Sequence, residues 1–541
     1  MSDVTMNSGL GVSSSRPRLD GKPHAGGALA FLAVLLAGLG YAAFSIYSDV
    51  SDVGEHGLAV GALVLLGLAL LVALGFEFVN GFHDTANAVA TVIYTHSLPP
   101  LVAVVWSGTF NFLGVLTSSG AVAYAIVSLL PVELILQVGS GAGYAMIFSL
   151  LIAAIIWNLG TWAFGIPNSS SHALIGSIMG VGLANQLLAP AGQATSGVDW
   201  TQALKIGEAL LFSPLIGFVL AAALLLAMKL VVRNKALYEA PRGNAPPPGP
   251  IRALLVATCT GVSFFHGSND GQKGMGLIML ILIGAAPTAY ALNRAVPEST
   301  TFAFLEATGR AQATFQTHAA GAAAPADAGA ARGAVSEALK TRAVNTPAVY
   351  AALAALSADI GNQVKQYGAI KAVPARATQN VRSDMYLASD AIHVMGPRPA
   401  GFSDEEIATL KSEQGWFNRG TRFIPTWVKV SVALALGLGT MVGWKRIVVT
   451  VGEKIGKTHM TYAQGASAEI VAMFTIGLAD AYGLPVSTTH VLSSGVAGTM
   501  AANGSGLQWS TLRAMALAWV LTLPAAMAIA GLLYAILRQV F

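Results

Sequence analysis

Residues 80–87 read Asn80-Gly81-Phe82-His83-Asp84-Thr85-Ala86-Asn87, and residues 266–273 read His266-Gly267-Ser268-Asn269-Asp270-Gly271-Gln272-Lys273. Both stretches interrupt apolar sequence, and a glycine and an aspartate align between them. A second pair follows later in the chain, at Gly165-Ile166-Pro167-Asn168-Ser169-Ser170-Ser171-His172 and at Gly483-Leu484-Pro485-Val486-Ser487-Thr488-Thr489-His490. Glycine, proline, three hydroxyls and histidine recur in this pair. The sequence therefore predicts two related halves.

The composition is far too apolar for a soluble domain. The chain has 541 residues, of which 54% are hydrophobic and 10% charged, and its mean hydropathy is +0.62. These values are typical of a polytopic membrane protein. About ten apolar stretches approach the roughly 20 residues that cross a bilayer, near 28–48, 57–79, 101–130, 143–165, 207–231, 251–265, 275–292, 424–443, 462–482 and 514–537. Shorter pieces at 166–188 and 484–502 are predicted to be re-entrant.

Basic residues near the chain start predict the orientation. Arg16, Arg18 and Lys22 precede the first apolar run, whereas acidic residues follow it, so the N-terminus is expected in the cytoplasm. Residues 1–27 are predicted to be a disordered cytoplasmic tail, and the run after them is too long for a cleaved signal peptide. The protein is thus expected in the cell inner (plasma) membrane.

The predicted domain boundaries follow changes in composition. An extra transmembrane helix and loop occupy 28–56, the first repeat 57–231, and a basic, proline-rich cytoplasmic linker 232–250. The second repeat begins at 251–292 and resumes at 424–541. Between its two parts, 293–423 is a polar, alanine-rich insert with several predicted helices, one of which starts with a capping box at Ser403. We interpret the insert as a spacer or interaction loop.

Two aspartates at equivalent repeat positions indicate a site for a proton or small cation. A carboxylate inside a membrane costs roughly 2.5 to 3.5 kcal/mol on insertion scales, so it usually faces a cavity or a partner. Each aspartate has an amide and an imidazole one and four positions before it, in swapped order. The predicted coupling residues are Asp84, Asp270, His83, Asn269, Asn80 and His266.

The proline-hydroxyl motifs predict anion-binding helix ends. Pro167 and Pro485 suit the first turn of a helix, whose free N–H groups and dipole attract anions. The neighbouring hydroxyls would add donors toward tetrahedral oxygens, although one such motif alone fits helix capping or close packing equally well. The predicted substrate-binding residues are Ser169, Ser170, Ser171, Ser487, Thr488 and Thr489, joined by Asn87 and Lys273.

Several other polar residues keep two interpretations. His172 and His490 fit a gating or proton-linked role, but a histidine in a span is often only hydrogen-bonded structure. Lys273 either touches the anion or only neutralises Asp270. Glu77, Glu469 and Asp480 lack a repeat partner and favour structural roles. No resident metal or cofactor and no nucleic-acid partner is expected.

These motifs resemble the PiT family of inorganic phosphate transporters over about 57–292 and 424–537. Residues 80–95, 268–274, 452–457 and 485–494 carry the resemblance. It implies an all-α membrane fold of two inverted repeats, each with a broken helix and a re-entrant helical hairpin. It also implies phosphate at the hairpin helix ends and cations at the Asp and Asn of the first motifs.

The first motif of the chain differs from that of the sodium-coupled members of this family, and this difference bears on the coupling ion. Sodium-coupled relatives generally show Gly-Ala-Asn-Asp in both halves, whereas residues 81–84 here read Gly-Phe-His-Asp. The resemblance therefore implies import of phosphate by proton symport, alone or as a neutral complex with a co-transported divalent metal. Sodium coupling and sulfate transport within the same family stay open, as does a homodimer.

Two other classes fit less well. An intramembrane hydrolase built from Ser169, His172 and Asp84 would leave the duplication of its residues unexplained and lacks a Gly-x-Ser-x-Gly elbow. An ion channel would dissipate its substrate gradient rather than accumulate substrate. The chain is therefore not expected to be an enzyme.

Overall fold

The computed structural model describes residues 16–19, 21, 25–52, 60–84, 86–127, 129–130, 141–189, 198–241 and 243–541, and the side chains at 52, 60, 86, 87, 201, 375 and 376 lie outside that description. Throughout these ranges the fold is helical, and the sole β-type pairing is an isolated bridge between Gly456 and Leu507. The predicted all-α class is confirmed. Of the predicted tail, residues 1–15, 20 and 22–24 lie outside the described residues.

The first half contains eight labelled helices, some short and some long enough to cross a membrane. They are α1 (Ala25–Asp52), α2 (Val60–Asp84), α3 (Ala86–Tyr94), α4 (Pro100–Thr117), α5 (Ala121–Val127), α7 (Gly141–Ala163), α8 (Ser170–Leu187) and α9 (Trp200–Val231). A short 3-10 turn, η1 (Lys235–Tyr238), lies in the linker to the second half.

The second half begins with α10 (Gly249–Ala285) and α11 (Pro287–Tyr290). The insert follows as η2 (Glu298–Thr300), α12 (Thr301–His318), α13 (Ala328–Thr341), α14 (Pro347–Tyr367), η3 (Ile370–Ala372), α15 (Ala375–Met395) and α16 (Asp404–Thr421). The chain ends with α17 (Thr426–Thr440), α18 (Lys445–Val449), the π-helical turn η4 (Thr450–Lys454), α19 (Tyr462–Ala481), α20 (Thr488–Ala502) and α21 (Trp509–Leu537).

One expectation about this half is wrong. The runs 251–265 and 275–292 were predicted to be separate spans around a broken helix, but α10 continues without interruption through the motif at 266–273. No proline occurs between 251 and 285 to force a break, and neighbouring helices bury the polar side chains. In the first half, Thr85 between α2 and α3 lies outside the described residues.

Six helices in the described ranges are long and apolar enough to cross a membrane, or seven if one bent pair counts as a span. This is fewer than the ten expected stretches. The helices α10 and α19 do not meet that criterion although both belong to the bundle, because each carries buried polar side chains along an apolar length. Polar residues in the middle of a membrane-spanning helix lower its mean hydropathy.

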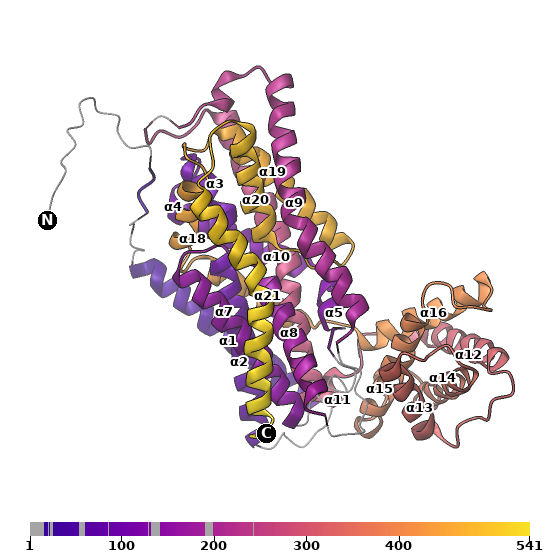
Figure 1. The fold of residues 1–541 in the computed structure, drawn as a ribbon. Helices are drawn as coiled ribbons and strands as arrows, with labels where there is room; N and C mark the ends of the chain where they lie inside the picture. The colour runs from indigo at the N-terminus through magenta and orange to yellow at the C-terminus, as the bar shows by residue number, and fades with distance from the viewer. Residues whose placement is uncertain are drawn as a thin grey trace, which may run out of the picture.

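Corresponding helices of the two halves pack in corresponding ways (Figure 1). The helix α8 packs along α21, and α20 packs along α9, so each half places a helix on the last long helix of the other. Likewise α2 packs on α17 and α10 on α4. At those two crossings the motif glycines allow close approach, because a Cβ at Gly81 would lie 2.2 Å from Leu436 O and one at Gly267 would lie 2.1 Å from Asn111 O.

The insert is a separate helical cluster beside one end of the bundle (Figure 1). Helices α12 to α16 share their own apolar core, which includes Phe304, Leu356 and Phe417. The predicted capping box is present, since Ser403 and Glu406 bond to each other's backbone N–H. The insert lies at the end of the bundle that holds the C-terminus, and the η1 linker lies at the opposite end.

Candidate functional site

The two helical hairpins α7–α8 and α19–α20 have matching tips. Gly165 and Gly483 take positive φ values of 65° and 66°, which favour glycine, and each ends the turn after the first helix. The next helices are then capped identically, because Ser169 accepts the His172 N–H and Ser487 accepts the His490 N–H, both at 3.2 Å. The motif repeats a local backbone structure.

The two motif prolines do not lie in the first helical turn, where they were predicted. Pro167 and Pro485 were expected in the first helical turn, but they lie in the extended segment two residues before the serine caps. The serine side chains therefore satisfy the first free N–H groups themselves. The rest of each helix end, including the next two hydroxyl residues, faces the other hairpin and the motif helices.

The two tips touch each other in the middle of the bundle. The Ser171 hydroxyl donates to the Val486 carbonyl at 3.0 Å. The rings of His172 and His490 lie with their centroids 4.6 Å apart, and His490 also stacks near Trp519. Segments more than 300 positions apart thus form one polar centre.

Asp84 ends α2 at this centre and meets both hairpins. It accepts hydrogen bonds from the Ser170 hydroxyl, in a short contact, and from the Thr489 hydroxyl at 2.9 Å. His83 Nδ1 lies 3.0 Å from the same carboxylate. Asn80, one turn earlier, accepts a bond from Ser170 at 2.7 Å. The carboxylate therefore occupies hydroxyl donors of both halves.

Asp270 holds the equivalent place on α10. Its carboxylate pairs with Lys273 Nζ at 2.6 Å and lies 3.4 Å from His266 Nε2. Lys273 is fully buried and also donates to the Ser171 hydroxyl in a short contact. Asn269 donates to the Leu484 carbonyl at 3.1 Å. The second motif thus reaches the tips of both hairpins.

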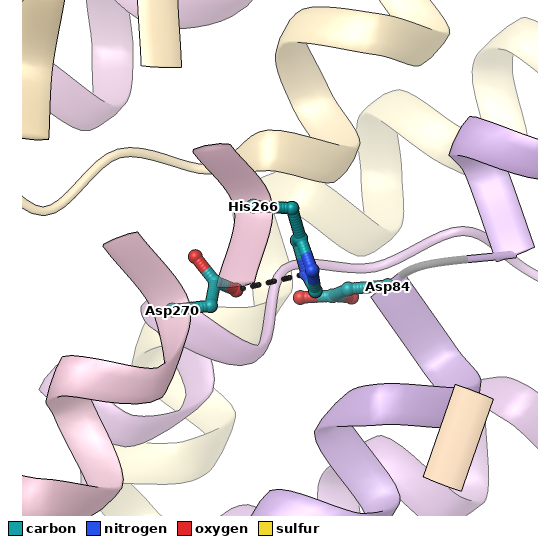
Figure 2. Close-up of side chains that lie close together, drawn as sticks. All are labelled: Asp84, His266 and Asp270. Carbon is teal, nitrogen blue, oxygen red and sulfur yellow. Dashed lines mark ion pairs between the residues drawn. The ribbon is translucent and has the colours of Figure 1, made fainter. Parts of the chain in front are cut away.

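The two motifs meet at a group of three potential cation ligands. One ligand atom each from Asp84, His266 and Asp270 lies within 4.8 Å of the others, and all three residues are buried (Figure 2). Figure 2 shows the imidazole of His266 between the two carboxylates, with its ion pair to Asp270. Carboxylate and imidazole donors suit a proton or a divalent metal ion.

The centre also has unused hydrogen-bonding capacity. Apart from His266 Nε2 and Asp270 Oδ2, which face each other at 3.4 Å, four buried atoms of the predicted site residues find no hydrogen-bond partner in the described part of the chain: Asn269 Oδ1, Thr488 Oγ1, His172 Nδ1 and His490 Nε2. Buried polar atoms are usually satisfied, so such a cluster marks a place for a polar ligand or water. The Asn87 side chain lies outside the described residues.

Two of the carboxylates for which structural roles were predicted, Asp480 and Glu469, accept hydrogen bonds from buried or partly buried side chains. Asp480 accepts bonds from Ser268 and Gln272 at 2.6 Å each and so braces α10 beside the motif. Glu469 accepts short bonds from the hydroxyls of Thr91 and Thr258. Asp480 lies three residues before Gly483. This closeness to the hairpin motif is the sequence feature that could have indicated its place near the site.

The buried polar centre within an all-helical apolar bundle defines a membrane transporter. The chain belongs to the phosphate transporter family, whose sequence profile matches residues 80–530. The predicted family is thereby confirmed.

The relatives named below are all phosphate transporters. The low-affinity inorganic phosphate transporter PitA of Escherichia coli (strain K12) is 43% identical over 500 residues, covering 88% of this chain and 97% of that protein. PitB of the same strain is 41% identical over 502 residues, covering 89% and 99%. A solved chain described as the sodium-dependent phosphate transporter is similar at a TM-score of 0.49 and 20% identity, covering 88% and 100%. The relatives are named as transporters, so the expectation of a non-enzymatic function is confirmed.

Proposed function

We propose that the protein imports inorganic phosphate by proton symport, alone or as a neutral complex with a divalent metal. The observation that carries this proposal is the bonding of Asp84 to hydroxyls of both hairpins, at Ser170 and Thr489. An incoming phosphate needs the same donors. Protonation of Asp84, or its capture by a metal, weakens its hold on them and frees them for the anion.

Coupling of this kind is what inward transport of phosphate requires. Moving a dianion into a cell with an inside-negative potential costs roughly 2.3 kcal/mol per charge per 100 mV, or about 4.6 kcal/mol for two charges. A uniporter would therefore leave phosphate at a lower concentration inside the cell than outside. A cation that binds at Asp84 and Asp270 compensates the charge, and each ligand then raises the affinity for the other.

The arrangement of the chain supports two inverted repeats with the N-terminus in the cytoplasm. The matching hairpin tips and the exchanged packing of α8 and α20 are what repeats related by a two-fold axis would produce. Pro17 and Arg18 line a cavity with Asn244, Pro246 and Arg252, so the basic N-terminal segment and the basic linker lie together. Basic segments favour the cytoplasmic side, and the insert then lies outside.

Gradient-driven uptake of radioactive phosphate into proteoliposomes tests the proposal. We expect accumulation under an inward proton gradient, and its loss in Asp84→Asn and in Asp270→Asn, because neither amide can exchange the coupling proton. Asp404→Asn is the matched control, since that residue is exposed in the insert. If both site variants keep gradient-driven accumulation, the coupling role is wrong.

The same assay separates the alternatives. A sodium gradient at equal pH on both sides would drive uptake only in a sodium-coupled protein, and the imidazoles of His83 and His266 beside the carboxylates favour protons. Competition by sulfate tests substrate selectivity. Uptake that needs added magnesium would identify the metal complex as the transported species.

A further inference from the structure

A second cluster of positive charge lies where the insert meets the bundle, at a cavity of about 30 Å³. It is lined on the insert side by Arg382 and Tyr386 of α15 and by Arg422, just after α16. Tyr124 of α5 and Gly276, Met279, Leu280 and Ile283 of α10 line the bundle side. No residue of this cavity belongs to the central site.

Arg382 is buried without an anionic partner. It is 6% exposed, its Nε has no hydrogen-bond partner, and no carboxylate in the described ranges lies within ion-pair distance of it. Its contact is with the face of Tyr386, 5.4 Å from the ring centroid. Burial lowers the pKa of this guanidinium. Isolated buried charges are strongly unfavourable, so charged residues inside proteins are normally paired.

The neighbours of Arg382 do not supply the missing charge. Arg422 adds a second guanidinium, 5.8 Å from the Tyr124 ring, and makes no ion pair with another described residue. The Tyr124 hydroxyl is buried and has no hydrogen-bond partner in the described ranges. α15 carries two acidic residues in this part of the fold. Asp384 is engaged by Arg332 at 2.6 Å, and Asp390 is close enough for its charge to act on Arg422 but makes no ion pair with either arginine in the described ranges. Two guanidinium groups and a phenol thus converge with no described carboxylate in direct contact.

We propose that Arg382, Arg422 and Tyr124 form an accessory site for a phosphate-class oxyanion at the junction of the insert and the bundle. Guanidinium groups bind such anions through paired N–H donors, and the tyrosine hydroxyl adds a third donor. The chemistry fits inorganic phosphate and equally the headgroup of an anionic phospholipid. For inorganic phosphate, the inference rests on the function proposed above.

The position of the cavity gives the accessory site a role in uptake. Met279 and Ile283 of α10 line it, and they lie about 14 to 20 Å along the helix from Asp270 at 1.5 Å per residue. α15 also lines a larger cavity of about 450 Å³ with Lys205, Lys411 and Arg342, of which Arg342 pairs with Asp199 at 2.8 Å. Positive charge at this junction would raise the local concentration of phosphate before it reaches the central site.

The experiment compares full-length wild type with Arg382→Met in phosphatidylcholine proteoliposomes, measuring KM and kcat for phosphate uptake. We expect KM to rise about tenfold, as loss of one charge-assisted hydrogen bond predicts, with kcat unchanged. The matched control is Arg310→Met, because Arg310 is exposed on α12 and pairs only with Glu306. It should leave KM unchanged.

Two further measurements separate binding from structure and phosphate from lipid. The ligand-free melting temperature should not fall in Arg382→Met, because an unpaired buried charge is removed, whereas a purely structural arginine would lower it. Native mass spectrometry in liposomes containing phosphatidylglycerol shows whether wild type retains an anionic lipid that the variant loses, which would identify a headgroup as the ligand.

The outcomes are distinct. If Arg382→Met matches wild type in both phosphate KM and retained anionic lipid, the accessory site is wrong even though wild type transports phosphate. If wild type does not accumulate phosphate, the proposed function fails instead. If Arg382→Met does not fold, Arg422→Met is judged by the same two measurements.

Discussion

Substitutions of Lys273 test how the buried charges of the central site compensate one another. Its ammonium group is fully buried and lies 2.6 Å from Asp270 and beside the Ser171 hydroxyl. Replacing it by methionine keeps most of the volume but leaves the carboxylate of Asp270 with only the His266 imidazole nearby, at 3.4 Å. Breaking a buried pair by removing one partner costs about 3–5 kcal/mol.

The double variant Lys273→Met/Asp270→Asn removes both charges together. We expect it to recover most of the stability lost in Lys273→Met, because no uncompensated charge stays buried. Thermal unfolding of purified protein in neutral detergent measures this, with wild type and both single variants completing the cycle. A double variant as unstable as Lys273→Met would refute the argument.

The same cycle decides between the two interpretations of Lys273. If the lysine only neutralises Asp270, the stable double variant binds phosphate as tightly as wild type. We expect a weaker affinity instead, because Lys273 also donates to Ser171, which places the ammonium at the hairpin tip. Equilibrium binding of radioactive phosphate at saturating proton concentration measures the difference. Unchanged affinity would assign the lysine to charge balance alone.

Two further predictions concern packing and the insert. Gly81→Ala should strongly lower the melting temperature, because its Cβ would lie 2.2 Å from Leu436 O and 3.0 Å from Thr440 N, both backbone atoms that cannot rotate away; Gly75→Ala in the same helix meets nothing within 4 Å and should melt like wild type. In the insert, burial raises the pKa of Glu413 to about 8, and the nearby Ser357 hydroxyl only partly opposes this. Between pH 4.5 and 8 the folded protein keeps a proton that the unfolded chain loses, so the free energy of unfolding falls as pH rises. Glu413→Gln should therefore match wild type near pH 5 and exceed it by about 4 kcal/mol at pH 8, measured by hydrogen exchange of insert peptides in the full-length protein; a difference that does not change with pH would contradict this.

The hairpin tips could be predicted from sequence because their structure is local. A glycine with positive φ, an extended proline and a serine that caps the next helix are all determined within a few residues. The nearly equal φ angles at Gly165 and Gly483 and the equivalent caps at Ser169 and Ser487 reflect this. The residues of the motif were therefore identified together, with only the place of the prolines wrong.

The continuity of α10 could not be predicted in the same way. A run of polar residues and glycines at 266–274 looks like a helix break when only the local sequence is considered. The structure keeps the helix because distant residues satisfy its side chains, as Asn111 does for His266 at 2.8 Å and Asp480 does for Gln272 at 2.6 Å. Tertiary contacts, which the local sequence does not reveal, therefore keep α10 continuous.

The crossing of the two halves was likewise outside the sequence signal. The sequence did not indicate which hairpin each motif would contact. Asp84 bonds to Thr489 of the second hairpin as well as to Ser170 of the first, and Lys273 bonds to Ser171 of the first. The aligned glycines Gly81 and Gly267 serve close helix crossings. Hydrogen bonds between residues hundreds of positions apart produce no periodic pattern in the sequence.

The spacing of the central charges explains why cation and anion would have to bind together under the proposed function. Ligand atoms of Asp84 and Asp270 lie within 4.8 Å of each other, where two unit charges repel by about 3.5 kcal/mol at an effective dielectric constant of 20. Lys273 offsets only one of the two carboxylates. A phosphate placed beside the other adds repulsion of similar size for each of its charges. A proton or metal at Asp84 removes these penalties, so phosphate binds poorly until the cation is present, and bound phosphate in turn raises the affinity for the cation.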